Sequence, residues 1–594
     1  MINRAWSTFF VIVVICLGFY SGGGGCSGNS GNSNSVDTDV ILLAKDIHMK
    51  LVRLDGTKLD LGSRPIPIRV ALEVTFPVKM NTFSVEGALS VHDPDGKLVS
   101  GVITWNDDKT VLTFLPSANL NYHATYGIEI AASALSDSGA PIEKILAYFE
   151  TMTKGDVNGD GSTDVVIGVK EVEPVANGVY YWDDSRIKTD HLSYIFNGAA
   201  LSGSLTTANA FAKIAVSNAR IMGDINADGY SDIIAGKDFV ETPTELPTGI
   251  DTSSANYGIA YIFNGGHSLG NLTPENASAT IDPRAEGGGL YISDAGSGEI
   301  NGDGYEDLIV RGYENSFVFS GKGLSGKLTS ENAFATIHEM VALKTIGDVN
   351  ADGKCDVVGT RLVSENGKPT KEVGYIFNGA TLVGTKTTND AMAILSDIDT
   401  KKEGDRGEVQ FSKVGDVNND GKDDLIVYSR WQSGCPGGSC LPTMEETLYI
   451  FSGSDFVGNV SKIKAISITT QDSYSYFPSS GAGDVNGDGY NDLIFNNKYI
   501  FSGKSLSGAL VPENALATIA DTDYAAFTAS VGDINMDQYD DILISEYPKE
   551  AAYVFSGAML SGTKKLSDAI ATITCVPSSE DLLCRIQPFI PENL

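Results

Sequence analysis

One short acidic loop recurs seven times in this chain, and it constrains the fold more than any other feature. The copy at residues 483–494 reads Gly-Asp-Val-Asn-Gly-Asp-Gly-Tyr-Asn-Asp-Leu-Ile, with Asp484 at loop position 1. Oxygen-bearing side chains stand at positions 1, 3, 5 and 9, and a glycine stands at position 6. A hard cation such as Ca²⁺ takes about six to eight oxygens, so several must come from one tight turn. The glycine permits the left-handed backbone that lets the carbonyl of Tyr490 and the carboxylate of Asp492 close on the same point.

The spacing of the seven loops marks a structural repeat. Their first residues are separated by 68, 75, 49, 68, 68 and 49 residues, so the repeat unit is about 60 residues long with variable insertions. A Tyr-Ile-Phe-type segment follows every loop, and an Ala-Thr-Ile-type segment comes later in several repeats, as at Ala279. The Tyr-Ile-Phe-type segments begin at Tyr194, Tyr261, Phe317, Tyr375, Tyr449, Tyr499 and Tyr553.

Each repeat unit is therefore expected to hold a strand, the acidic loop and three further strands. Seven units of four strands predict an all-β chain with a seven-bladed β-propeller. A linear β-solenoid is the alternative, but its repeat periods are shorter, and seven units is a common number for closing a ring.

The EF-hand is the chief alternative for the loops themselves. That motif needs a bidentate glutamate at position 12 and flanking helices. Position 12 is Ile167 in the first loop and Ala235 in the second, and the residues after position 9 are β-branched or apolar, which favours strands. A catalytic metal centre keeps an open coordination position with acid–base groups nearby. These loops would fill the coordination sphere themselves, so the pattern predicts a structural metal.

The loop together with the Tyr-Ile-Phe-x-Gly segment resembles the FG-GAP repeat of integrin α-subunit heads and its bacterial relatives, over residues 154–575. The resemblance implies up to seven structural Ca²⁺ sites within the blades, away from the central axis. Each site would use the side chains of positions 1, 3, 5 and 9 and the carbonyl of position 7. Two loops depart from the pattern, because Glu299 replaces the first aspartate of the third loop and Gln538 replaces the glycine of the seventh. A non-glycine residue in a left-handed conformation is costly, so the seventh site is expected to be the weakest.

The ligand residues that the resemblance implies fall into seven sets of five. They are Asp156, Asn158, Asp160, Ser162 and Asp164; Asp224, Asn226, Asp228, Tyr230 and Asp232; Glu299, Asn301, Asp303, Tyr305 and Asp307; Asp348, Asn350, Asp352, Lys354 and Asp356; Asp416, Asn418, Asp420, Lys422 and Asp424; Asp484, Asn486, Asp488, Tyr490 and Asp492; and Asp533, Asn535, Asp537, Tyr539 and Asp541.

Residues 38–153 carry a different β pattern. Apolar residues alternate from Ile68 to Phe76, and turn-forming residues such as Pro94-Asp95-Gly96 separate the runs. This pattern predicts a small β-sandwich. Segments such as Val74 to Met80 and Phe149 to Thr151 resemble the bacterial Ig-like domain of S-layer and surface proteins, which implies a spacer.

The first 25 residues are expected to be a signal peptide. Arg4 precedes an apolar run, Phe9 to Tyr20, that is too short to span a bilayer comfortably. The segment leading to Cys26 resembles a bacterial lipoprotein signal, in which Cys26 would carry the lipid, although Gly23 stands where leucine is usual. A secretory signal with an incidental cysteine is the alternative. A flexible Ser/Gly/Asn stalk is expected over residues 26–37.

The remaining cysteines agree with export. Cys435 with Cys440, and Cys575 with Cys584, have spacings that suit small disulfide-closed loops in an oxidising compartment. Cys355, at position 8 of the fourth loop, is left over and is predicted to be a buried, unpaired thiol. Residues 576–594 are expected to form a C-terminal tail.

Several function classes are disfavoured. The formal net charge of −34 argues against nucleic acid as a partner. Gly266-His267-Ser268-Leu269-Gly270 matches a hydrolase nucleophile motif, but it aligns with the turn that every repeat carries. The chain's six histidines are scattered, and we find no catalytic constellation.

Two function classes remain. The first is a surface-tethered, calcium-stabilised propeller that serves as a binding or adhesion module for a protein or carbohydrate ligand at the bacterial cell envelope. A lipid anchor would be its only membrane attachment, and we expect it in the outer membrane or at the cell surface. The alternative is an extracellular enzyme on a propeller scaffold, such as a polysaccharide lyase or a phospholipase relative. Insertions at 241–257 and 428–446 are candidate binding loops.

Overall fold

The computed structural model describes most of the chain from residue 42 onward. The described ranges are 42–172, 192–216, 218–236, 258–283, 290–312, 315–340, 342–365, 368–396, 398, 406–432, 444–473, 479–522, 526–546, 551–577 and 583–588. The expected signal peptide, the stalk, the lipidation residue Cys26, the Cys435–Cys440 pair and the 241–257 insertion all lie outside the described residues.

The all-β expectation is confirmed for the described residues. They contain many sheets and a single α-helix of five residues, α1 (Thr82–Glu86). None of the described helices has the length and apolar character needed to cross a membrane. The chain divides into two compact units, and the segments 64–69 and 118–123 belong to the second unit rather than the first.

The first unit contains two antiparallel sheets among its described residues. One has the order β2-β1-β3-β6-β5 and the other β4-β7-β8. Along β3, the residues Val70, Leu72 and Val74 are buried and alternate with half-buried neighbours, as the period of two predicted. The bounds are β1 (His48–Arg53), β2 (Lys58–Leu59), β3 (Val70–Thr75), β4 (Leu89–His92), β5 (Gly101–Trp105), β6 (Val111–Pro116), β7 (Thr125–Ile130), β8 (Ile145–Glu150) and the 3-10 helix η1 (Ala44–Asp46).

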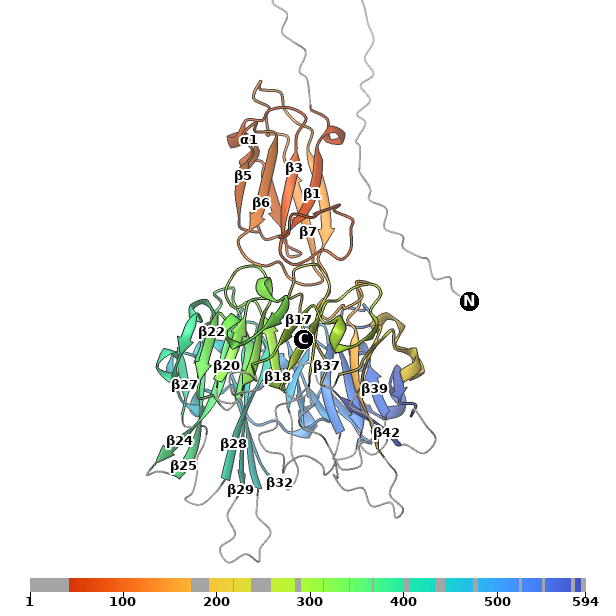
Figure 1. Ribbon diagram of the computed structural model, residues 1–594, viewed down its shortest axis with the longest axis vertical. Coiled ribbons are helices and arrows are strands. Elements are labelled where there is room, and N and C mark those ends of the chain that lie inside the picture. Colours follow the sequence, from red (N-terminus) through yellow and green to blue (C-terminus); the bar gives the residue numbers. More distant parts are fainter. Residues whose placement is uncertain are drawn as a thin grey trace, which may run out of the picture. The chain divides into compact units, whose positions relative to one another are not determined.

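The second unit repeats one sheet plan. In the fifth repeat, β28 (Arg406–Gly415) leads into the acidic loop, and β29 (Asp424–Gln432), β30 (Met444–Phe451) and β32 (Ser467–Ser473) follow as antiparallel neighbours (Figure 1). This is the predicted series of one strand, the loop and three strands. Apolar residues such as Ile426 and Ile450 are fully buried along the central strands, because these strands are covered on both faces.

The other repeats follow the same plan. Their strands are β9 (Val165–Val172), β10 (Leu192–Phe196) and β12 (Ala212–Ile214); β13 (Arg220–Ile221), β14 (Ile233–Ala235), β15 (Ala260–Phe263) and β17 (Ala279–Ile281); β18 (Leu290–Gly298), β19 (Asp307–Gly312), β20 (Asn315–Phe319) and β22 (Ala335–His338); β23 (Ala342–Gly347), β24 (Asp356–Glu365), β25 (Lys368–Phe377) and β27 (Ala393–Leu395); β33 (Ser480–Gly483), β34 (Asp492–Phe495), β35 (Tyr499–Phe501) and β36 (Ala517–Ile519); and β37 (Ala526–Gly532), β38 (Asp541–Glu546), β39 (Ala551–Phe555) and β41 (Ala571–Thr574).

Short 3-10 helices lie at two places in the described repeats. One set follows the Tyr-Ile-Phe-type strand and consists of η3 (Gly198–Ala200), η7 (Gly321–Gly323), η9 (Gly379–Thr381), η11 (Gly453–Asp455), η13 (Gly503–Ser505) and η15 (Gly557–Met559). The other precedes the Ala-Thr-Ile-type strand and consists of η4 (Thr207–Asn209), η5 (Pro274–Asn276), η8 (Ser330–Asn332), η10 (Thr388–Asp390), η12 (Lys462–Lys464), η14 (Pro512–Asn514) and η16 (Leu566–Asp568).

A fifth strand, which the sequence did not predict, links each repeat to the one before it. It is a short segment between the two 3-10 helices, and it pairs in parallel with the last strand of the preceding sheet. In the fifth sheet a single parallel bridge between Ser467 and Gly508 takes its place among the described residues. These strands are β16 (Gly270–Leu272), β21 (Gly326–Leu328), β26 (Gly384–Lys386), β31 (Gly458–Val460) and β40 (Gly562–Lys564).

The two ends of the repeated region complete each other's sheets. β11 (Gly203–Thr206), from the first repeat, pairs in parallel with β41 of the seventh. β42 (Leu583–Pro588) lies within the segment expected to be a tail, and it pairs antiparallel with β9 of the first repeat. The first repeat has no strand of its own before its loop among the described residues, and β42 fills that edge of the sheet.

Apolar clusters join consecutive repeats all the way round. Among the described residues each cluster draws side chains from two neighbouring sheets, as where Ile376 of the fourth repeat packs with Val427 of the fifth. One further cluster contains Ile167 of the first repeat and Val554 of the seventh, together with Ile586 of β42. The repeats are therefore packed in a cyclic order, from the first to the seventh and back to the first.

Candidate metal-binding loops

All seven acidic loops lie within the described residues, each at the same place in its repeat. In the second to seventh repeats the loop follows the first strand of the sheet, and in every repeat the aspartate at position 9 stands at or just before the start of the next strand, as Asp424 does in β29. The loops of the second to seventh repeats are therefore held by strands at both ends.

The loop backbone is left-handed at two positions in every copy. Position 6 was predicted to be left-handed, and its φ lies between 74° and 95°, with Gln538 at 74° in the seventh loop. Position 4 was not predicted, yet it is also left-handed, with φ between 56° and 82°. A signal was present, because glycine or asparagine occupies position 4 in four loops; its occupants are Gly159, Ala227, Gly302, Ala351, Asn419, Gly487 and Met536.

The carboxylate at position 1 is held by backbone N–H groups of its own loop. In the sixth loop Asp484 accepts from Asp488 N at 3.1 Å and from Gly489 N at 2.8 Å. Glu299, the longer residue of the third loop, reaches the same place and accepts from Gly302 N and Gly304 N, both at 2.6 Å. The glutamate therefore reproduces the arrangement.

The seventh loop, despite its glutamine, also closes in the same way. The N–H of Gln538 donates to the position 1 carboxylate of Asp533 at 2.7 Å. The departure at position 6 thus changes the backbone strain of the loop and leaves this bond intact.

The carboxylate at position 9 joins the loop to the third strand. In the sixth loop Asp492 is fully buried and accepts from Val485 N at 3.1 Å and from the side-chain amide of Asn486 at 2.9 Å. Its other oxygen accepts at 3.0 Å from Gly503 N, which comes just after the Tyr-Ile-Phe segment. This residue must be a glycine because a Cβ on Gly503 would collide with the carbonyl oxygen of Asn491 in the same loop.

Position 5 has a similar double attachment. Asp488 accepts from Tyr490 N at 3.1 Å with one oxygen, and its other oxygen accepts from Ser502 Oγ at 3.1 Å. In the third loop, Asp303 accepts from Tyr305 N at 3.0 Å with one oxygen and from Ser320 Oγ at 2.7 Å with the other. Both carboxylates are thereby fixed in one orientation.

Burial makes the position 9 aspartates hard to ionise. Burial first, and the neighbouring loop carboxylates second, together raise the pKa of Asp164 and Asp307 to about 8, although backbone N–H groups oppose the shift. Burial raises the pKa to about 7 in the fourth to seventh loops, at Asp356, Asp424, Asp492 and Asp541. A bound cation would favour the charged carboxylates that burial disfavours.

Two loops contain a buried oxygen atom without a hydrogen-bond partner. The side-chain oxygen of Asn418, at position 3 of the fifth loop, is buried and accepts no hydrogen bond, and that of Asn535 in the seventh loop is the same. Both are implied ligands. An orphaned buried acceptor is rare in folded proteins, and a cation would satisfy it.

The oxygen donors therefore fit a hard cation, although the carboxylates are not gathered into one cluster. Among the described residues, no group of three or more His, Cys, Asp and Glu side chains is arranged to hold a metal ion. The loops instead offer a mixture of carboxylate, asparagine and carbonyl oxygens, which is the donor mixture that Ca²⁺ takes.

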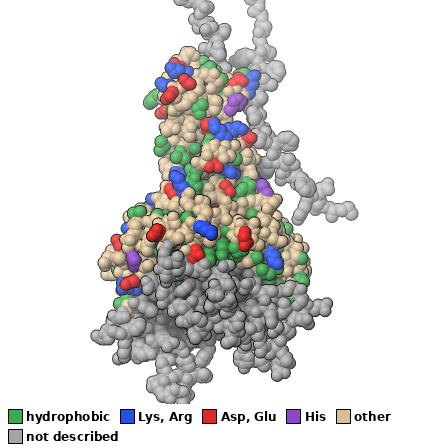
Figure 2. Space-filling view, viewed as in Figure 1, with side chains coloured by type: hydrophobic (Ala, Val, Ile, Leu, Met, Phe, Trp, Pro, Cys, Tyr) green, Lys and Arg blue, Asp and Glu red, His purple; other side chains and the backbone are tan. Residues whose placement is uncertain are grey.

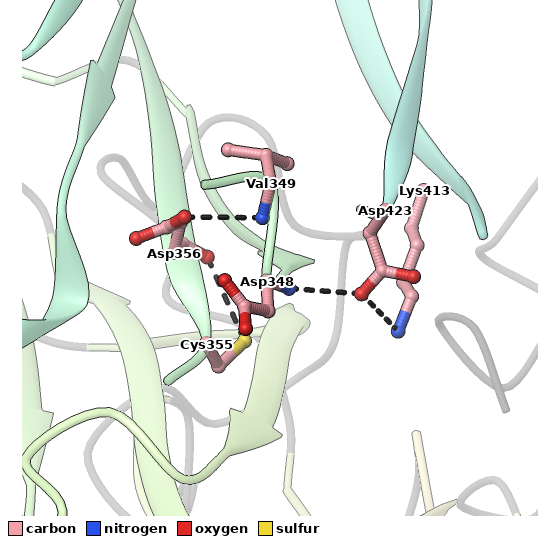
Figure 3. Close-up of polar contacts among 6 residues, drawn as sticks. All are labelled: Asp348, Val349, Cys355, Asp356, Lys413 and Asp423. Carbon is pink, nitrogen blue, oxygen red and sulfur yellow. Dashed lines mark hydrogen bonds and ion pairs between the residues drawn. The ribbon is translucent and has the colours of Figure 1, made fainter. Parts of the chain in front are cut away.

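Neighbouring loops are bonded to each other through position 8. Asp423, at position 8 of the fifth loop, accepts from Asp348 N at 2.8 Å, and its own N–H donates to the carbonyl of Asp348 at 3.0 Å (Figure 3). Lys413 Nζ lies 3.4 Å from the same carboxylate. In the same manner, the carboxylate of Asp540 accepts from Asp484 N at 2.7 Å, and Asp540 N donates to the carbonyl of Asp484 at 3.1 Å. Sequence reasoning missed position 8, because its residue type varies.

The glycine before each loop makes room for the position 8 side chain of the next loop. A Cβ on Gly347 would collide with the carboxylate of Asp423, and one on Gly298 would lie 2.7 Å from Cys355 Sγ. The last such contact runs from the seventh repeat to the first, where a Cβ on Gly532 would lie 3.0 Å from Thr163 Oγ1. The loop contacts follow the same cyclic order as the apolar clusters.

The cysteine predictions have mixed outcomes. Cys355 is a free thiol among the described cysteines, and it is half-buried rather than fully buried. Burial raises its pKa to about 12. Cys575 takes part in a disulfide, while the side chain of Cys584 lies outside what the structure describes.

Acidic side chains are not confined to one region of the visible surface. In Figure 2, Asp and Glu side chains are interspersed with Lys and Arg over the described residues that face the viewer. Other acidic side chains are buried in the loops, since the position 9 aspartates of the second to seventh loops are fully buried.

Comparison with known proteins gives a weak, partial similarity to integrin α chains, and no family model matches the chain. Integrin α-PS2 of Drosophila melanogaster is 24% identical over 298 residues, which is 46% of this chain and 19% of that protein. Integrin α-IIb of Mus musculus is 28% identical over 233 residues, 37% of this chain and 19% of that protein. The matched region thus spans about a fifth of either relative, and it supports an FG-GAP-like character for the repeats.

Solved structures give only distant likenesses. The rhamnogalacturonan lyase YesW has 12% identity and a TM-score of 0.25, covering 84% of this chain and 68% of that one. The Vibrio cholerae biofilm matrix protein Bap1 has 12% identity and a TM-score of 0.20, covering 82% and 81%. Scores this low carry no argument about fold or function.

Proposed function

We propose that the second unit is a seven-bladed β-propeller of FG-GAP-type repeats and that the first unit is an Ig-like sandwich. The cyclic order of strand exchange, apolar clusters and loop contacts supports the propeller, because a linear solenoid would leave the first and last repeats apart. The two antiparallel sheets of the first unit support the sandwich.

The loops, on this proposal, bind structural Ca²⁺. The side chains of positions 1, 3, 5 and 9 and the carbonyl of position 7 would hold the ion. The orphaned oxygens of Asn418 and Asn535 and the buried carboxylates of position 9 support a cation there. When bound, Ca²⁺ would neutralise the loop carboxylates and stiffen the turn between two strands. The protein's own groups already hold those carboxylates in place through N–H bonds.

The function that we propose is ligand binding or adhesion at the outside of the cell, by a protein that is exported and tethered through Cys26. The observation that carries this proposal is the similarity of the repeated region to integrin α chains. The ligand would be a protein or a carbohydrate at the cell surface. Extracellular calcium would then be available to fill the loops, which agrees with the proposed site chemistry.

An array experiment tests this function. The purified chain, without its signal peptide, is applied to glycan and extracellular-matrix protein arrays in Ca²⁺ and again after calcium removal. We expect calcium-dependent binding to a defined ligand without chemical change in that ligand. Cleavage of any glycan would contradict the adhesion proposal and support the enzyme alternative.

A further inference from the structure

The first, third and sixth acidic loops are each covered by a side chain from the next repeat. In these three loops the covering residue stands at position 7 of the following loop and lies against the glycine at position 4. A Cβ on Gly159 of the first loop would collide with the ring of Tyr230, and one on Gly487 of the sixth loop would lie 2.7 Å from the ring of Tyr539. In these two loops the cover is a neutral aromatic ring.

The third loop has a different cover, the charged side chain of Lys354. A Cβ on Gly302 would lie 2.7 Å from Lys354 Cε and 2.9 Å from Nζ. The ammonium group donates a hydrogen bond of 3.1 Å to the backbone carbonyl of Asn301, at position 3 of the third loop. This lysine therefore places a positive charge against the main chain of the third loop, at its positions 3 and 4.

We infer that Lys354 acts as a fixed cation of the third loop and weakens calcium binding there relative to the first and sixth loops. The inference rests on the proposed function, since it concerns the affinity of one of the proposed calcium loops. The ammonium group lies against the loop that would hold the ion, so Ca²⁺ entering the third loop is repelled by a nearby like charge. Such a repulsion lowers the affinity by at least about tenfold when the charges are partly shielded from water.

An exposed lysine outside the acidic loops supplies a matched control. Lys327 lies on β21 with an exposed side chain, and it belongs to none of the seven loops. Removing the charge of Lys327 changes the net charge of the protein by the same amount without removing an ammonium group from a loop.

The experiment measures bound calcium per chain by equilibrium dialysis at controlled free calcium. Lys354→Met keeps the carbonyl that position 7 offers to the fourth loop and removes only the charge. We expect it to fill one additional site at low free calcium, with the midpoint for that site at least about tenfold lower than in the wild-type chain. Lys327→Met should leave the binding curve unchanged.

A second variant assigns the additional ion. Asp303→Asn removes a position 5 carboxylate of the third loop, and the amide oxygen can still accept from Tyr305 N, so the fold should survive; far-UV circular dichroism checks this. In Lys354→Met/Asp303→Asn the additional ion should disappear. An unchanged curve for Lys354→Met, or an equal shift for Lys327→Met, would overturn the inference while leaving calcium binding itself intact. A wild-type chain that binds no calcium would overturn the proposed function and this inference together.

Discussion

The carboxylate of Asp423 accepts the backbone N–H of Asp348 at 2.8 Å, although 75 residues separate them in the chain. Asp348 opens the fourth loop, and Asp423 lies in the fifth. The bond therefore fixes the start of one loop to the end of the next. Because the same position 8 contact recurs in other repeats, the loops form a chain of bonded neighbours in addition to their own internal closure.

Asp423→Ala should destabilise the protein. The substitution leaves the N–H of Asp348 and the ammonium group of Lys413 without their shared acceptor, which costs about 1–3 kcal/mol. Urea denaturation followed by circular dichroism measures this. Asp455→Ala is the control, since Asp455 forms only a local ion pair of 3.4 Å with Lys464. That pair should be worth less than about 1 kcal/mol. Equal losses for the two variants would contradict the assigned role of Asp423.

Gly379→Ala should destabilise the protein by at least about 1–3 kcal/mol, because the new Cβ would collide with the backbone carbonyl of Cys355. The backbone cannot move aside without disturbing the position 9 bond that Gly379 N makes to Asp356 at 2.9 Å. Thermal unfolding measures the effect. Gly323→Ala in η7 is the control, since that Cβ position has open space and an ordinary φ. Equal melting temperatures for the two variants would show that the close approach at Gly379 does not require a glycine there.

Gln538→Gly should stabilise the seventh loop. The glutamine holds a φ of 74°, where a residue with a Cβ is disfavoured by about 1 kcal/mol relative to glycine. Gln538→Ala keeps the Cβ and serves as the matched control. The urea midpoint should rise for the glycine variant and stay near the wild-type value for the alanine variant. A gain of the same size in both would show that the side chain, and not the backbone strain, is responsible.

The metal-free protein should lose stability as the pH rises. Burial raises the pKa of Asp164 and Asp307 to about 8 in the folded chain, against 3.8 for the ordinary group. Between these values the folded state binds more protons than the unfolded state, so stability is present below about pH 4 and is lost as the pH rises through about 8. The melting temperature of calcium-depleted protein should be higher at pH 5.5 than at pH 8. A melting temperature that rises over this range would contradict the burial effect.

Calcium should reverse that pH dependence. Binding requires ionised carboxylates, so saturating Ca²⁺ should raise the melting temperature more at pH 8 than at pH 5.5. At a free calcium concentration of a hundred times Kd, each filled site adds about 2.7 kcal/mol. Magnesium is the control, because it demands a tighter octahedral arrangement than these loops offer. A melting temperature that does not change with calcium at pH 8 would contradict the proposal of structural calcium sites.

The sequence predicted the local parts of this structure well. Oxygen spacing and strand-forming residues identified the loops and the strand on either side of each, since both depend on residues close together in the chain. The expected weakness at Gln538 also rests on a local conformation, and the structure places that residue at a positive φ as the argument requires.

The contacts between repeats were not predictable in the same way. The fifth strand of each sheet, such as Gly384–Lys386, has three residues and too short a pattern to be recognised. Position 8 holds Thr163, Cys355 or Asp423 in different repeats, because its role is to fill space beside a glycine of another repeat. Lys354 was expected to offer only its carbonyl, and its side chain proved to reach the third loop. These relationships exist only once distant segments are packed together.

The pairing of β42 with β9 has a consequence for biogenesis. The first repeat emerges from the ribosome or the export channel before the other six, while the strand that completes its sheet comes only after the seventh repeat. Until then β9 keeps an unpaired edge, which can add strands from other chains. Loss of β42 should therefore act on the start of the repeated region, and the newly exported chain depends on rapid delivery of β42 to avoid association with its neighbours.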